Sequence, residues 1–261
     1  MSSVRPLRTV RVTRYVTPLR EGGSLPAIVE ADDDGLYVLK FRGAGHGAAA
    51  LTAELVAGEL ARAIGLPVPE LVFAEVDAEL ARTEPDPEIH ALIWESAGLN
   101  LALDYLPGSV TFDPIAFRPD AELASRIVWF DGYVMNVDRT PRNTNMLLWH
   151  RKLWLIDHGS TLYFHHTAGW ESADTRARDP FPLIREHVLV RLASRLEHVD
   201  AILGPMLDRD LITEIVDLIP DVWLRDGEPG RESRVRDAYA RYLLERVQAP
   251  RPFLEEALRG R

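Results

Sequence analysis

Residues 136–160 read NVDRTPRNTNMLLWHRKLWLIDHGS, a polar loop followed by two short apolar runs that flank a His-Arg-Lys turn. Asp138 lies near the start of the loop, and Asn143 and Asn145 follow it by five and seven positions. The two apolar runs predict an antiparallel hairpin, which would return Asp157 to the side of the loop. Two carboxylates with an amide oxygen between them suit Mg²⁺, a hard ion that takes oxygen ligands. The stretch therefore predicts a carboxylate site for a divalent cation.

Short apolar runs bounded by turn signals precede this stretch and indicate strands. The expected strands cover 7–16, 24–30, 36–41, 71–76, 89–94 and 99–106. One helix is expected over 48–64, because leucine and isoleucine recur there on one helical face. Gly65 and Pro67 end that helix, and a polar loop is expected over 78–88.

The rest of the chain is mainly helical in pattern. Helices are expected over 121–135, 183–198, 200–218, 232–247 and 251–258, around the hairpin of residues 146–156. The sequence thus predicts an α+β chain of two lobes. A small β-rich N-lobe is expected over 1–103 and a helical C-lobe over 104–261.

Composition narrows the functional classes. Of the 261 residues, 46% are apolar and 27% are charged, as in ordinary soluble domains. The formal net charge of −10 repels phosphate backbones, so direct nucleic-acid binding is not expected. The absence of cysteine excludes disulfides, zinc fingers, iron–sulfur sites and thiol catalysis. The first twenty residues lack the apolar core of a signal peptide and no apolar run could span a membrane, so we expect cytoplasmic residence without a membrane partner.

Lysine is rare in this chain. Of the thirty basic residues only Lys40 and Lys152 are lysines. Lys40 lies near the end of the strand expected over 36–41.

Further motifs stand in a fixed order before the polar loop. Lys40 ends the strand Tyr-Val-Leu-Lys, Glu54 follows on the expected helix, and residues 60–69 read LARAIGLPVP. With the Asp-x₄-Asn loop, the hairpin and the Asp-His-Gly that begins at Asp157, the chain resembles the short members of the HipA-like kinase family over residues 20–165. The resemblance implies the two-lobed protein-kinase-like fold, with ATP and Mg²⁺ as cofactors.

The resemblance also implies roles for single residues. Lys40 would contact the α- and β-phosphates of ATP, and Glu54 would hold Lys40 by an ion pair. Asp138 would orient the acceptor hydroxyl and accept its proton, and Asp157 would bind the Mg²⁺ that bridges the phosphates. The sequence departs from protein kinases in two respects. Asn136 stands two residues before Asp138, where they have histidine, and Asp-His-Gly stands where they have Asp-Phe-Gly.

The sequence leaves two parts of the expected site undecided, namely the second metal ligand and the backbone contacts to the phosphates. Asn143 has the spacing from Asp138 that the second metal ligand requires, whereas Asn145 directly precedes the apolar strand, which is the usual register of that ligand. Asn143 is preferred as the metal ligand because of its spacing, Asn145 is the alternative, and both are candidate catalytic residues.

Backbone groups are expected to contribute the remaining nucleotide contacts. Gly22, Gly23 and Ser24 lie between the first two strands, where kinases cover the phosphates, and the glycine-rich loop of residues 43–47 is an alternative. Tyr105 and Leu106 fall where the segment between the lobes would present backbone groups to adenine.

The expected function is ATP- and Mg²⁺-dependent transfer of the γ-phosphoryl group to a hydroxyl, preferably serine or threonine of a protein. The alternatives are a small-molecule phosphotransferase of the aminoglycoside type and a nucleotide-binding pseudokinase. The acceptor, protein or small molecule, is not identified, and an antitoxin partner is not assumed because the chain is too short for the extra subdomain of the larger HipA toxins.

A histidine metal centre is the rival site. It would combine Asp157 with His158, His165 and His166. Adjacent side chains on a strand face opposite ways, so His165 and His166 are not expected to bind one ion. The carboxylate site is therefore preferred.

Overall fold

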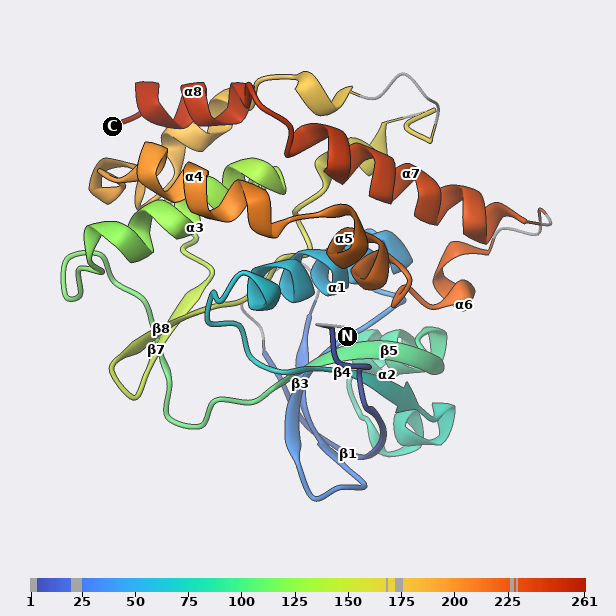
Figure 1. The fold of residues 1–261 in the computed structure, drawn as a ribbon. Coiled ribbons are helices and arrows are strands. Elements are labelled where there is room, and N and C mark those ends of the chain that lie inside the picture. The colour runs from blue at the N-terminus through green and yellow to red at the C-terminus, as the bar shows by residue number, and fades with distance from the viewer. Residues whose placement is uncertain (1–3, 20–24, 168, 172–175, 226–227, 229) are drawn as a thin grey trace.

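The computed structural model describes residues 4–19, 25–167, 169–171, 176–225, 228 and 230–261. Five strands form a closed barrel at one end of the molecule, and most of the helices gather at the other end (Figure 1). Helix α1 (Ala48–Ala63) lies between the two parts, under α5 (Arg209–Val216) and above the strands. The molecule is a small β-rich lobe joined to a helical lobe, as the sequence predicts.

The barrel follows the strand order β1-β2-β3-β5-β4. Neighbouring strands are antiparallel, and a parallel pairing of β1 with β4 closes the barrel. Their bounds are Thr9–Pro18 for β1, Ala27–Ala31 for β2, Leu36–Lys40 for β3, Leu71–Val76 for β4 and Gly98–Asp104 for β5. Closure removes the unpaired sheet edges that an open five-stranded sheet would expose.

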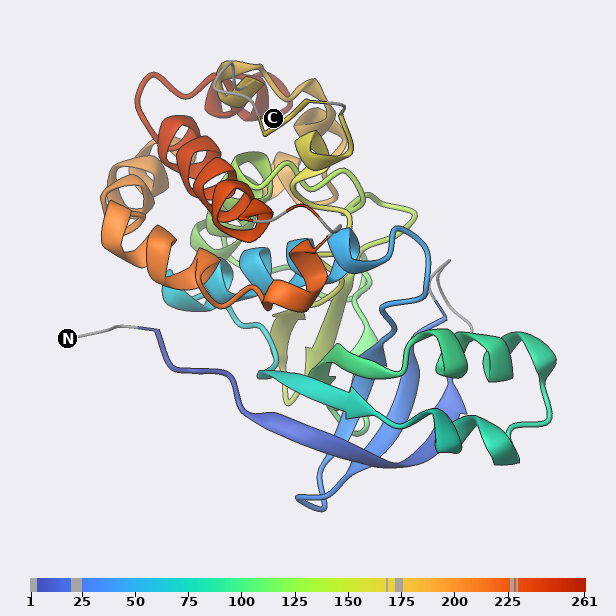
Figure 2. The ribbon, with the colours of Figure 1, turned by 90° about the vertical axis from the view of Figure 1, so that its right-hand side faces the viewer.

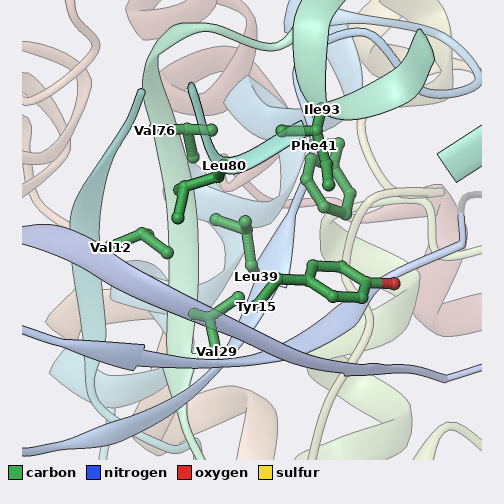
Figure 3. A pocket seen from close by; sticks show the side chains of 8 residues that line it. All are labelled: Val12, Tyr15, Val29, Leu39, Phe41, Val76, Leu80 and Ile93. Carbon is green, nitrogen blue, oxygen red and sulfur yellow. The ribbon is translucent and has the colours of Figure 1, made fainter. Parts of the chain in front are cut away.

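An apolar hollow lies inside the barrel. Side chains of the barrel strands and of the two short helices beside them line it (Figure 3), namely Val12, Tyr15, Val29, Leu39, Phe41, Val76, Leu80 and Ile93. The lining carries no charged group, so the hollow offers nothing to bind a phosphate.

The segment between β4 and β5 differs from the expectation. A strand was predicted over 89–94, but Pro87–Glu95 is helix α2, preceded by the 3₁₀ helix η1 (Ala78–Thr83). Asp86 caps α2 by accepting a hydrogen bond from the N–H of Glu88, and Pro87 is pre-set for the first helical turn. Ile89, Leu92 and Ile93 then form one buried helical face. Figure 2 shows η1 and α2 side by side against the barrel.

Helix α1 is buried on nearly all sides. All residues from 51 to 61 are buried, because the helix contacts β4 and β5 on one side and α5 and α6 (Asp221–Leu224) on the other. Gly65, with φ of 80°, ends the helix in the left-handed conformation that glycine adopts without strain. Since α1 is held from both lobes, its side chains can connect them.

The helical lobe is built on α3 (Ala121–Tyr133) and on a small sheet of order β6-β7-β8. The strands are β6 (Val110–Thr111), β7 (Met146–Trp149) and β8 (Lys152–Leu155), and the last two form the predicted hairpin. The remaining helices are α4 (Leu196–Met206), α5, α6, α7 (Arg231–Arg246) and α8 (Pro252–Arg259). Four 3₁₀ helices complete the lobe, η2 (Tyr163–His166), η3 (Arg176–Arg178), η4 (Pro182–Glu186) and η5 (Val190–Leu192).

Two predicted helices of this lobe are wrong in extent. The helix expected over 183–198 is replaced by η4 and η5, because the ring of His187 accepts a hydrogen bond from the N–H of Leu189 and diverts the backbone. The helix expected over 200–218 breaks after Pro205, and Asp208 caps α5 by accepting from the N–H of Leu211.

The apolar core is divided in two. One cluster fills the barrel, and a second runs from α1 through α3 into α7 and α8. Within the described part of the chain, no helix is both long enough and apolar enough to traverse a lipid bilayer.

Candidate active site

Lys40 is placed by the alternation of side chains along β3. Tyr37 and Leu39 are buried in the barrel, so Val38 and Lys40 point away from its interior. The Nζ atom of Lys40 lies 3.5 Å from Oε2 of Glu54 on α1 and 2.7 Å from Oδ1 of Asp157. The fold therefore brings together three segments, of which the first and last are 117 positions apart.

The buried charged side chains of this cluster have partners of opposite charge. The side chains of Lys40 and Glu54 are 12% and 2% exposed, whereas that of Asp157 is 39% exposed. Burial opposes the charged form of Lys40, but the carboxylates of Glu54 and Asp157 outweigh it and raise the pKa of Lys40 above its ordinary value. Burial also opposes the charged form of Glu54, but Lys40 and His158 together outweigh it, so the pKa of Glu54 is lowered. Lys40 and Glu54 are thus a charged pair at neutral pH.

Asp138 lies in the polar loop after α3. Its N–H donates to Oδ1 of Asn136 at 3.1 Å, which fixes the start of the loop. Its Oδ2 accepts from Nδ2 of Asn143 at 2.8 Å and from Nδ2 of Asn145 at 3.1 Å. Both asparagines proposed from the sequence therefore contact one carboxylate oxygen. Within the described residues the second oxygen, Oδ1, accepts no hydrogen bond, so it is available to a substrate hydroxyl.

Asn145 links the loop to the hairpin. Its side chain contacts Asp138, while its carbonyl accepts from the N–H of Ile156 at 3.1 Å, one residue before Asp157. Asn145 and Asp157 both have left-handed backbones, with φ of 46° and 58°. Asparagine and aspartate tolerate this conformation better than other residues with a side chain, and it is common at functional sites.

A buried charged network supports the loop, and the sequence analysis did not find it. Oδ2 of Asp131 accepts from Nε of Arg139 at 2.7 Å and contacts Nε2 of His187 at 2.8 Å. Oδ1 of Asp131 accepts from Nδ2 of Asn136 at 2.9 Å, and Arg139 also donates to the carbonyl of Asn145. The network thus holds both ends of the loop that carries Asp138.

The protonation of this network follows from its contacts. Nδ1 of His187 accepts a hydrogen bond from the N–H of Leu189, so Nε2 carries the proton and donates to Asp131. Burial outweighs the attraction of Asp131 and lowers the pKa of His187. Burial opposes the charge of Asp131, but Arg139 and His187 outweigh it and hold its pKa well below the usual range. The one sequence signal for this network was an aspartate within the apolar run of α3, where a charge requires a partner.

Of the residues expected to contact the nucleotide through their backbone, some lie outside the described residues and others have protein partners. Gly22, Gly23 and Ser24 lie outside the described residues. The N–H of Tyr105 donates to the carbonyl of Leu36 at 3.0 Å, and Leu106 is buried with its carbonyl accepting from Ser109 at 3.1 Å. Tyr105 and Leu106 do follow β5 at the junction of the two lobes, but these backbone groups already have protein partners.

The geometry assumed for the rival histidine site is wrong. His165 and His166 lie on η2 and not on a strand, and their Nε2 atoms are 3.0 Å apart, so they face each other. Nδ1 of His165 contacts the hydroxyl of Tyr239 at 2.9 Å, and the ring of His166 packs against that of His46. Within the described residues, no three histidine, cysteine, aspartate or glutamate side chains are arranged to hold a metal ion.

The donors around Asp157 fit a different kind of metal site. Mg²⁺ keeps several waters and is usually held by one or two carboxylates together with substrate phosphates. Asp157 offers a partly exposed carboxylate, and Asn143 and Asn145 offer amide oxygens in the adjoining loop. This oxygen-only set suits a hard cation that arrives with a nucleotide.

Comparison with known proteins identifies the family. The family model described as HipA-like kinase matches residues 12–253. The crystal structure of the Helicobacter pylori proinflammatory kinase CtkA is similar to this chain with a TM-score of 0.54 at 11% identity, covering 98% of each chain. A Golgi casein kinase is also similar, with a TM-score of 0.44 at 11% identity over 94% of this chain and 72% of that one. Its structure with Mn and ADP bound gives 0.41 at 11% identity, over 96% and 76%.

A search of curated proteins gives no match. The similarity to CtkA shows that the fold is kinase-like, with the β-rich lobe and the helical lobe described above. The family model covers most of the chain, from β1 to the start of α8. This protein belongs to the HipA-like kinase family.

Proposed function

We propose that the protein transfers the γ-phosphoryl group of ATP, with Mg²⁺, to a hydroxyl, and that the acceptor is serine or threonine of a protein. The observation that supports this most strongly is the cluster of Lys40, Glu54 and Asp157, which joins a barrel strand, helix α1 and the end of the hairpin. A strand lysine paired with a helix glutamate, beside an aspartate that can hold Mg²⁺, is the arrangement that phosphoryl transfer by protein kinases uses.

Each residue of the site has a chemical task in this proposal. Lys40 binds the α- and β-phosphate oxygens with a point charge, and Glu54 holds Lys40 in place. Asp157, with Asn143 or Asn145, would hold Mg²⁺, which supplies charge neutralisation on the phosphates when it is bound. Because Asp157 now contacts Lys40 at 2.7 Å, this contact must loosen when nucleotide and cation enter.

Asp138 acts on the acceptor. Its free Oδ1 accepts the proton of the acceptor hydroxyl while the hydroxyl oxygen attacks the γ-phosphorus. The bond from the γ-phosphorus to the β–γ bridging oxygen breaks, and ADP leaves. Asn143 and Asn145 keep Asp138 oriented through its Oδ2.

The test is incubation with γ-labelled ATP and Mg²⁺, comparing the wild type with Asp138→Ala. Loss of a positioned base lowers kcat by about 10² to 10⁴, and a large loss of label transfer is therefore expected. Label on a protein supports the protein acceptor, and label on a metabolite alone supports the small-molecule alternative. Binding of ATP without any transfer by the wild type would refute the proposed activity and identify a pseudokinase.

A further inference from the structure

Within the part of the chain that the structure describes, the buried polar atoms of Glu54 and His158 make no hydrogen bond. Both carboxylate oxygens of Glu54 and both ring nitrogens of His158 are unpaired, although the side chains are only 2% and 0% exposed. Buried polar groups in folded proteins are nearly always paired, so an unpaired set of four in one place needs a reason. The two groups face each other, with Nδ1 of His158 3.6 Å from Oε1 of Glu54.

The segment that carries His158 is docked on helix α1. The hydroxyl of Thr161 donates to the carbonyl of His158 at 2.7 Å and lies 3.5 Å from the carbonyl of Ala53. A Cβ on Gly159 would lie 3.6 Å from Oε2 of Glu54 and from the carbonyl of Ala50, so the backbone there is in contact with the helix. The imidazole is thus held opposite Glu54 by the fold around it.

The two oxygens of Glu54 have separate neighbours. Oε2 faces Lys40 at 3.5 Å and Oε1 faces His158 at 3.6 Å, and both separations are just beyond hydrogen-bond range. Lys40 also lies 2.7 Å from Asp157, so its charge is shared between the two carboxylates. Hydrogen bonds in sites without substrate are often long and tighten when substrate binds.

We propose that His158 is a positioning residue that donates its Nδ1–H to Oε1 of Glu54, and so keeps Glu54 aimed at Lys40 while Lys40 binds the nucleotide phosphates. This inference rests on the proposed kinase activity. The phenylalanine that protein kinases carry after the metal-binding aspartate has no proton to donate, so the histidine adds a second partner for the helix glutamate. His158 contacts neither the nucleotide nor the acceptor in this proposal.

A matched pair of substitutions separates the hydrogen bond from packing. In His158→Asn the side-chain amide keeps a hydrogen-bond donor near the position of Nδ1. In His158→Leu the side chain has nearly the shape of asparagine but carries no donor. We expect His158→Leu to raise the KM for ATP about tenfold with a smaller change in kcat, and His158→Asn to stay within about threefold of the wild type. His90→Leu, at an exposed position of α2, is the control and should match the wild type.

A double-mutant cycle tests whether His158 acts through Glu54. In a Glu54→Gln background, His158→Leu should add no more than a twofold rise in the KM for ATP, because the charged acceptor is gone. Equal impairment of His158→Asn and His158→Leu, or the full effect of His158→Leu in the Glu54→Gln background, would overturn the proposal.

The tautomer of His158 can be measured in the wild type, whether or not the protein shows activity. Nitrogen NMR of the ¹⁵N-histidine-labelled wild type should show a proton on Nδ1 of His158, with the signal assigned by its loss in His158→Asn or by selective labelling. A neutral ring protonated only on Nε2 contradicts the inference. If the wild type neither binds nor turns over Mg-ATP, the proposed function fails, while the tautomer still decides whether His158 donates to Glu54.

Discussion

Two clusters of charged side chains differ in how closely their members are hydrogen-bonded. Under the loop that carries Asp138, Asp131, Arg139 and His187 are joined by hydrogen bonds of 2.7 and 2.8 Å and are almost fully buried. On helix α1, Glu54 faces Lys40 and His158 at 3.5 and 3.6 Å. The first cluster is a fixed support, whereas the second has room to rearrange when a charged ligand enters.

The largest loss of stability is expected for substitutions in the cluster of Asp131, Arg139 and His187. Every contact that Asp131 makes in the network comes from a donor, so the amide of Asp131→Asn would place an N–H₂ against another donor and leave Arg139 unneutralised. Disrupting a buried ion pair costs about 3 to 5 kcal/mol. Urea unfolding of the variant should show a loss of that size.

An exposed ion pair provides the control for this substitution. Glu30 pairs with Arg14 at the barrel surface, where solvent screens the pair, so Glu30→Gln should lower the free energy of unfolding far less than Asp131→Asn. A loss in Asp131→Asn no larger than that in Glu30→Gln would show that the network does not support the loop.

The same chemical change at Glu54 should cost less. Glu54→Gln removes a charge whose contacts are long, and Lys40 keeps Asp157 as a partner, so the loss of stability should be smaller than in Asp131→Asn. Binding of Mg-ATP should weaken nevertheless, because Lys40 loses its anchor. Denaturation and nucleotide titration of one preparation measure both, and a loss of stability equal to that of Asp131→Asn would remove the distinction between the clusters.

Acidification should lower the stability of the folded protein through protonation of His187. The pKa of His187 is lowered in the folded protein, so the unfolded chain binds the extra proton first and stability falls as pH drops below about 6.5, at most about 1.4 kcal/mol per pH unit for one proton. His165 and His166 also have lowered pKa values, so the comparison must isolate His187.

The comparison is between the wild type and His187→Gln at pH 7.5 and 5.5. The wild type should lose about 1 kcal/mol more on acidification than the variant, since the variant lacks the titrating ring. Equal losses in the two proteins would mean that His187 does not take up a proton over this range.

Local signals in the sequence were sufficient to predict the polar loop of residues 136–145 and the hairpin that follows it. The spacing of Asp138, Asn143 and Asn145 and the two apolar runs are short-range features, and the structure has the hairpin where they predict it. The sequence left the choice between the two asparagines open. In the structure both of them contact the same oxygen of Asp138. Their roles, and those of the other site residues, stay predictions.

Features that depend on distant partners were missed. His187 contacts Asp131 across 56 positions, and nothing near either residue in the sequence announces the pair. The helix α2 was missed for a different reason, since the apolar run of residues 89–94 outweighed the Asp-Pro start signal before it. The division into lobes at residues 103 and 104 also stays a prediction, because α1 packs against both parts.

The most direct test of the account is the rate of phosphoryl transfer from Mg-ATP by Asp157→Asn relative to the wild type. This substitution keeps the shape of the side chain and removes the charge that contacts Lys40 and that would hold the cation. We predict transfer reduced by about 10² or more, with a cooperative unfolding transition like that of the wild type. Transfer at the wild-type rate would contradict the claim that Lys40, Asp138 and Asp157 form one phosphotransfer site.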